Sequence, residues 1–169
     1  EQLAQAMATL ANDGVMYRPR LVRYIENVNS GERRFIEPEA VSTTPFKREN
    51  IEFIKRALAG VNIEGTGARA FAGAEYTSAG KTGTAQVVAL KANEKYVESR
   101  VAERHRDHAL FIAFAPLDSP KIALAVLVEN SGFGARAAAP IARIALDYYL
   151  LGKRPKKAVE DDEKGANSD

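Results

Sequence analysis

Cysteine is absent from the 169 residues of this chain, which excludes a disulfide framework, a thiol nucleophile and a cysteine-ligated zinc site. An excess of one charge is absent too, because 24 basic residues stand against 22 acidic ones and leave a formal net charge of +2. The basic residues are scattered along the chain, so we expect no nucleic-acid partner. No apolar run approaches the roughly 18 residues that a membrane helix needs, and no signal peptide opens the chain.

The composition that remains is that of a globular domain rather than a disordered chain, with 46% hydrophobic and 27% charged residues. This length suffices for one domain with a sizeable core. The first residues already follow a helical pattern with no capping residue ahead of them, so we expect the chain to be part of something longer. We predict one domain over residues 1–152, followed by a disordered polar tail over 153–169.

Three segments place apolar residues at helical spacing, and we predict helices over 1–12, 47–59 and 137–151. The second helix should stop at Gly60 and the third at Gly152, because glycine favours helix ends. The stripes predicted to be buried are Leu3, Ala6, Met7 and Leu10; then Ile51, Ile54 and Leu58; and last Ile141, Ile144, Ala145, Tyr148 and Leu151.

Shorter periods indicate strands in the rest of the chain. Residues 15–46 are typical of a small hairpin with its turn at 29–31. Strands are also predicted over 84–90, 109–115 and 121–128. The last two are apolar on both faces, as in central strands, and the short link between them requires an antiparallel pair. The predicted fold class is therefore α/β (α+β), with an antiparallel sheet covered by helices on both faces.

The stretch TSAGKTGTAQV (77–87) fits three motifs at once. A phosphate-binding loop fails on spacing, because Glu75 stands where its first glycine is required. Ser78 and Lys81 spell the S-x-x-K pattern of a serine nucleophile with its base. On a strand these two residues point to opposite faces, so Lys81 could not take the proton of Ser78. The third motif, K-T-G, remains.

Two further patterns have a simpler explanation. Residues 132–137 resemble a dinucleotide fingerprint, but no later strand could carry the carboxylate that binds a ribose, so we expect a turn into a close-packed helix. His105 and His108 are spaced as metal ligands would be only on a helix, whereas a strand follows them directly. We therefore predict no metal site.

The residue types of K-T-G suit a substrate-binding strand. Thr82 and Thr84 share one face of an extended strand and can present two hydroxyls to a carboxylate, and Lys81 adds a fixed positive charge. Gly83 allows another chain to approach the backbone closely. An edge strand would also offer unpaired N–H and C=O groups to a peptide.

Several stretches together carry a resemblance to a known family. The segments SAGKTGTAQVV (78–88), LKANEKY (90–96), ERHRDHALFIAFAP (103–116) and KIALAVLVEN (121–130), with the last helix, closely resemble the C-terminal half of the transpeptidase domain in class B penicillin-binding protein two. That family comprises the elongation-specific peptidoglycan transpeptidases of Gram-negative bacteria. The resemblance covers residues 1 to about 152 and implies a penicillin-binding/β-lactamase-like fold of which only the C-terminal half is present.

The resemblance implies a D-Ala-D-Ala transpeptidase that works by serine acyl transfer without a cofactor and is the target of β-lactams. Carried onto this chain, Lys81 would be a catalytic electrostatic and proton-relay partner. The hydroxyls of Thr82 and Thr84 would hold the donor carboxylate, and the backbone N–H of Thr84 would be one of two oxyanion donors. Gly83 would keep the strand accessible to substrate.

The chain also departs from the family pattern, in which S-x-x-K and S-x-N lie upstream of K-T-G. No serine here begins S-x-N, and only Ser78 begins S-x-x-K. We therefore expect no nucleophile in this chain and no activity from it alone. The expected partners are an N-terminal part of the same protein, peptidoglycan stem peptides, β-lactams and elongation-complex membrane proteins. The resemblance implies the periplasmic face of the inner membrane, with an N-terminal anchor helix that this chain lacks. The alternative is a non-catalytic module that binds stem peptides.

Overall fold

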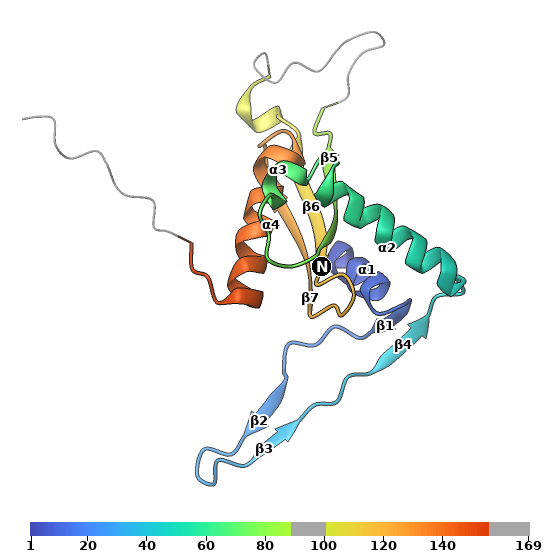
Figure 1. Ribbon diagram of the computed structural model, residues 1–169. Coiled ribbons are helices and arrows are strands. Elements are labelled where there is room, and N and C mark those ends of the chain that lie inside the picture. The colour runs from blue at the N-terminus through green and yellow to red at the C-terminus, as the bar shows by residue number, and fades with distance from the viewer. Residues whose placement is uncertain (89–100, 156–169) are drawn as a thin grey trace, which may run out of the picture.

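A three-stranded antiparallel sheet lies at the centre of the structure, a computed structural model that describes residues 1–88 and 101–155 (Figure 1). Parts of the predicted strand 84–90 and of the predicted tail, and all of LKANEKY (90–96), fall outside the described residues. The elements, in chain order, are α1 (Gln2–Ala11), β1 (Val15–Tyr17), β2 (Tyr24–Glu26), β3 (Arg33–Phe35), β4 (Ala40–Thr43), α2 (Arg48–Ile63), α3 (Ala68–Phe71), β5 (Ala79–Ala85), η2 (Glu103–His105), β6 (His108–Ala115), β7 (Ile122–Val128) and α4 (Gly134–Leu151).

The sheet has the order β5-β6-β7, and β6 is its buried middle strand. Five β6 residues have no exposed surface: Ala109, Phe111, Ala113, Phe114 and Ala115. The predicted antiparallel pairing of β6 with β7 is confirmed. The prediction that both are central strands was wrong for β7, which lies at an edge of the sheet in the described part of the chain and leaves 54% of Leu127 exposed.

Helices cover both faces of this sheet, as predicted. On one face, residues of α4 pack against β6, and Phe71 of α3 stacks on Phe111 with ring centroids 5.6 Å apart. On the other face, Met7 of α1 and Ala59 of α2 form a second core with Phe114. The mixed α/β class with an antiparallel sheet between helices is therefore confirmed.

The predicted end of the second helix was wrong, because α2 continues through Gly60 to Ile63. A single glycine costs a helix about 1 kcal/mol, and burial on both sides of it offsets that cost. The predicted stripe also shifts: Ile54 is 44% exposed, whereas Lys55 is buried. The Lys55 ammonium donates to the carbonyl of Ala11 and pairs with Asp13, so the buried charge is satisfied.

The last helix ends at Gly152 as predicted, in the left-handed conformation that favours glycine, but it begins at Gly134. Its predicted stripe was wrong, since Ile141, Ile144 and Tyr148 are each about half exposed. The buried residues are Gly134, Ala138, Ala139, Ala142 and Leu146. Small side chains allow the helix to lie close on the sheet, a contact that apolar periodicity weighted toward large residues does not reveal.

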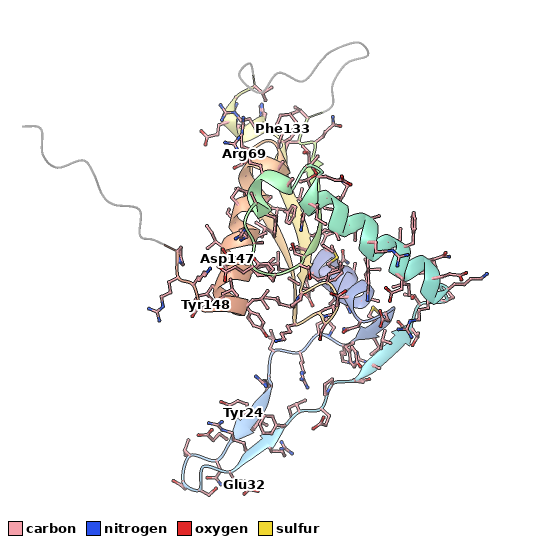
Figure 2. The ribbon with its side chains drawn as sticks, viewed as in Figure 1. Tyr24, Glu32, Arg69, Phe133, Asp147 and Tyr148 are labelled. Atoms are coloured by element: carbon pink, nitrogen blue, oxygen red, sulfur yellow. The ribbon has the colours of Figure 1, made fainter. Side chains whose placement is uncertain are left out.

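The predicted hairpin over 15–46 is present as an arm that extends away from the sheet (Figure 1). β1 pairs with β4 near the body of the molecule, and β2 pairs with β3 farther out. Tyr24 and Glu32 mark the outer part of this arm in Figure 2. No helix among residues 1–88 and 101–155 is long and apolar enough to span a membrane.

A polar cluster fixes the segment that leads into β5. The Tyr76 hydroxyl donates to Asp147 at 2.8 Å, and Arg143 donates to the same carboxylate oxygen at 2.7 Å. Arg143 also donates to the carbonyl of Ala72 at 3.1 Å. Burial is the main cause that raises the pKa of Tyr76, and the hydrogen bond to Asp147 is the second. Tyr76 therefore stays a neutral donor. The cluster ties the entrance of β5 to α4.

Gly134 fixes the distance between α4 and the sheet, and its replacement tests this packing. A Cβ at Gly134 would lie 2.1 Å from the carbonyl oxygen of Leu110 and 2.6 Å from that of Gly83. We expect Gly134→Ala to lower the free energy of unfolding by about 2 kcal/mol, because backbone atoms must move apart. In Gly60→Ala the new Cβ would meet only Oε1 of the Glu64 side chain, at an ordinary contact distance of 3.9 Å. That control should raise the free energy by about 0.5–1 kcal/mol. Denaturant unfolding of both variants measures this, and equal effects would contradict the packing described.

Candidate active-site strand

The K-T-G residues lie in the middle of β5, which begins at Ala79. The predicted strand 84–90 therefore began too late. The reason is tertiary: Ala79 is buried against α1 and α2, and a Cβ at Gly80 would come within 2.7 Å of the Phe111 ring. Close packing and the pairing of β5 with β6 override the low strand propensity of alanine and glycine.

The register of β5 against β6 sorts the K-T-G side chains between two faces. Thr82 is paired with Phe111, which lies on the α4 side of the sheet. Thr84 is opposite Ala109, on the same side, whereas Lys81 is opposite Ile112, which packs on the α1 and α2 side. The predicted alternation is therefore confirmed.

One edge of β5 has no strand beside it in the described residues. Thr84 is exposed, and the exposed Lys81 side chain donates from Nζ to the carbonyl of Thr82 at 2.9 Å. We infer that this carbonyl faces the open edge. Because alternate residues of an antiparallel strand direct their N–H and C=O groups to the same edge, the N–H of Thr84 faces it too.

The hydroxyl of Thr82 has a partner from the connection between α2 and α3. Its Oγ1 lies 2.8 Å from Oγ1 of Thr66, and either atom can be the donor. Sequence reasoning gave no role to Thr66, because a hydroxyl pair between two separate segments leaves no periodic signal.

Ser78 and Lys81 have different partners. Ser78 is buried just before β5, and its Oγ accepts a hydrogen bond from Nδ2 of Asn62 at 2.9 Å. Lys81 is exposed and bonds to the Thr82 carbonyl. The hydroxyl of Ser78 thus joins β5 to α2, whereas the Lys81 side chain lies at the exposed strand edge.

The remaining motifs have structural roles. Gly134, within the stretch that resembles a dinucleotide fingerprint, lies against the sheet backbone as the first residue of α4. His108 accepts a hydrogen bond at Nδ1 from the N–H of Asn130 at 3.0 Å. No group of three His, Cys, Asp or Glu side chains suited to a metal ion occurs in residues 1–88 and 101–155.

A pocket of about 370 Å³ opens beside Ser78, between the end of α2, α3 and the segment before β5. Its wall is mostly apolar and includes Phe71 and Leu117. The polar members are Asn62, Tyr76, Thr77 and Ser78. The K-T-G side chains do not line it. The candidate site is therefore the open edge of β5 and not this cavity.

Comparisons with known proteins show which family this chain is similar to. Residues 1–147 match the family described as penicillin binding protein transpeptidase domain. The peptidoglycan D,D-transpeptidase MrdA of Haemophilus influenzae is 42% identical over 159 residues, which is 92% of this chain and 24% of that protein. MrdA of Escherichia coli K12 is 37% identical over 154 residues, covering 89% of this chain and 24% of that protein. The chain thus spans about a quarter of the length of these curated relatives.

Two solved structures show the same fold. Pseudomonas aeruginosa PBP2 in complex with WCK 5153 aligns with a TM-score of 0.65 at 34% identity, over 94% of this chain and 31% of that one. Penicillin-binding protein A from M. tuberculosis, as a ceftriaxone acyl-enzyme complex, aligns with a TM-score of 0.66 at 28% identity, over 87% and 31%.

The role of Ser78 can be tested by stability. Ser78→Ala leaves the buried Nδ2 of Asn62 without the partner it has now, so we expect a loss of about 1–3 kcal/mol in the free energy of unfolding. Ser42→Ala, on the exposed surface of β4, is the control and should change stability by no more than about 0.5 kcal/mol. Indistinguishable unfolding curves for the two variants would show that the Asn62–Ser78 bond does not hold β5 to α2.

Proposed function

This chain belongs to the penicillin-binding protein transpeptidase domain family, and from that membership we propose that it is the C-terminal part of a peptidoglycan D,D-transpeptidase that cross-links stem peptides during cell elongation. The two MrdA relatives support this proposal by their names and by their coverage of this chain. The observation that carries it is the K-T-G strand itself, which offers two hydroxyls, a lysine and the Thr84 N–H along an edge that no strand of the described residues covers.

The proposed reaction is acyl transfer in two steps. A serine hydroxyl attacks the carbonyl carbon of the penultimate D-alanine in a donor stem peptide, and its proton passes to the leaving amine. The terminal D-alanine departs, and an ester to the serine remains. An acceptor amine then attacks this ester, forms the new amide, and returns a proton to the serine oxygen. β-Lactams inhibit such enzymes by stopping at the ester, and the acyl-enzyme complex of the mycobacterial relative is consistent with that chemistry.

The roles of the strand residues follow from their positions. The donor peptide ends in a carboxylate, and the hydroxyls of Thr82 and Thr84 share the face on which they could both donate to it. The Thr84 N–H would stabilise the negative oxygen of the tetrahedral intermediate, a contribution worth about 3 kcal/mol in other acyl-transfer enzymes. Lys81 lies on the opposite face and reaches around the edge toward the Thr82 carbonyl. There it would supply positive charge and a proton route, and Gly83 would leave the backbone open.

The proposal requires a serine from outside this chain. Its source would be an upstream segment of the same protein with S-x-x-K and S-x-N, and that segment would also carry a membrane anchor. The site would then lie on the periplasmic face of the inner membrane, where stem peptides, β-lactams and the membrane proteins of the elongation complex are available.

Covalent labelling with a fluorescent penicillin tests the proposal. We expect no adduct with this chain alone and a stoichiometric adduct once the chain is extended upstream to include S-x-x-K and S-x-N. In the extended protein, replacing both Thr82 and Thr84 by valine should slow acylation by about tenfold or more per lost hydroxyl, because each donates to a charged acceptor.

The same experiment separates the alternatives. An adduct mapped to Ser78 in the chain alone would overturn the proposed division of the site. Saturable binding of stem peptide by the extended protein, without any acylation, would identify a non-catalytic binding module instead.

A further inference from the structure

Thr66 is a hydrogen-bond partner of Thr82, one of the two residues whose hydroxyls are proposed to bind substrate. It lies in the connection between α2 and α3, and its side chain touches the K-T-G strand through the 2.8 Å contact with Oγ1 of Thr82. We propose that Thr66 is a positioning residue, which directs the proton of the Thr82 hydroxyl toward the carboxylate of the donor peptide or β-lactam. The proposal rests on the proposed transpeptidase function and assigns Thr66 a role in it.

The turn that carries Thr66 is fixed against the end of α2. The N–H of Gly65 donates to the carbonyl of Gly60 at 3.0 Å, and the N–H of Gly67 donates to that of Val61 at 2.9 Å. A Cβ at Gly65 would lie 2.8 Å from the Cα of Val61. At Gly67 a Cβ would lie 2.5 Å from Oδ1 of Asn62. The two glycines that flank Thr66 therefore pack so closely on α2 that the turn between them has little freedom.

The end of α2 is in turn fixed to β5 (Figure 1). Asn62 donates to Ser78 at 2.9 Å, and the two side chains are only 6% and 7% exposed. Asn62 and Ser78 are 16 residues apart in sequence, as are Thr66 and Thr82. The two bonds thus connect the same two segments at successive points, the first buried and the second at the exposed site.

A hydroxyl has one proton to donate and two lone pairs that accept. The bond between Thr66 and Thr82 therefore affects whether the Thr82 proton is available to a ligand. Thr82 can donate to a carboxylate only if its single proton points toward the ligand. When Thr66 donates to Thr82 Oγ1, it occupies a lone pair and leaves the Thr82 proton for the carboxylate. Donation through a chain of hydroxyls also strengthens each bond in it. The Thr82 side chain is β-branched and has few rotamers, so a fixed neighbour is enough to select one.

This role predicts a defect in ligand binding rather than in chemistry. In the extended protein that carries S-x-x-K and S-x-N, Thr66→Val keeps the shape of the side chain and removes only the hydroxyl. We expect it to weaken the noncovalent penicillin complex about three- to tenfold, the range for one lost neutral hydrogen bond. The rate constant for acylation within the complex should change much less. Thr66→Ser should restore most of the lost affinity, and Thr43→Val, on the exposed arm, is the matched control.

Two comparisons distinguish a positioning role from a general loss of structure. Thr66→Val should have no further effect when Thr82 is already valine, and no effect on the residual acylation by a penicillin whose carboxylate is methylated. Stopped-flow acylation measures the dissociation constant of the noncovalent complex and the rate constant for acylation in each case.

If the extended protein is acylated and Thr66→Val reacts like the unsubstituted protein, the positioning role is wrong. It is also wrong if the loss persists with the methyl ester. If the unsubstituted extended protein is not acylated at all, the proposed function itself fails.

Discussion

The register between β5 and β6 is the constraint on which the rest of the structure depends. Seven pairs, from Ala79 with Phe114 to Ala85 with His108, hold the K-T-G strand against the most deeply buried strand of the sheet. A slip of one residue would exchange the two faces and place Lys81 where the threonine hydroxyls now lie. Burial of β6 on both faces makes such a slip costly, since its apolar side chains are already packed on each side. The stability of the core and the geometry of the candidate site therefore rest on the same strand pairing.

The elements around β5 restrict it from three directions. α4 approaches through Gly134, which lies on the backbone of Gly83 and Leu110. The cluster of Tyr76, Arg143 and Asp147 holds the segment that enters the strand. Asn62 at the end of α2 supplies a hydrogen bond at Ser78, and Thr66 in the turn after α2 supplies one at Thr82. No strand lies beside the other edge of β5 in the described part of the chain, and an open edge on an otherwise fixed strand suits a peptide that binds by adding a strand. A preorganised strand also spends less binding energy on ordering itself when the ligand arrives.

Much of this fold could be predicted from sequence, for identifiable reasons. The continuous apolar runs of β6 and β7 and the short link between them were enough to predict an antiparallel pair. The type and spacing of Lys81, Thr82 and Thr84 were enough to predict how their side chains divide between the faces of a strand. Periodicity failed where small residues do the packing, as in α4, where Ala138, Ala139 and Ala142 are buried. The larger side chains Ile141 and Tyr148 are about half exposed. Sequence reasoning also failed at Gly60, where we expected α2 to end. Packing in the folded protein stabilises the helix beyond this glycine, so that it continues to Ile63. The hydrogen bonds of Thr66 and Asn62 could not be predicted from the sequence, because each joins two segments that come together only in the folded chain.

In the function proposed above, the edge of β5 holds a substrate carboxylate and an acyl oxygen for a serine supplied by an upstream segment. A crystal structure of the extended protein acylated by a penicillin tests this most directly. The account predicts carboxylate oxygens within about 3.2 Å of the hydroxyls of Thr82 and Thr84. It also predicts the ester carbonyl oxygen within about 3.1 Å of the Thr84 nitrogen. An ester whose carboxylate lies away from β5, or whose carbonyl oxygen points away from Thr84, would contradict it.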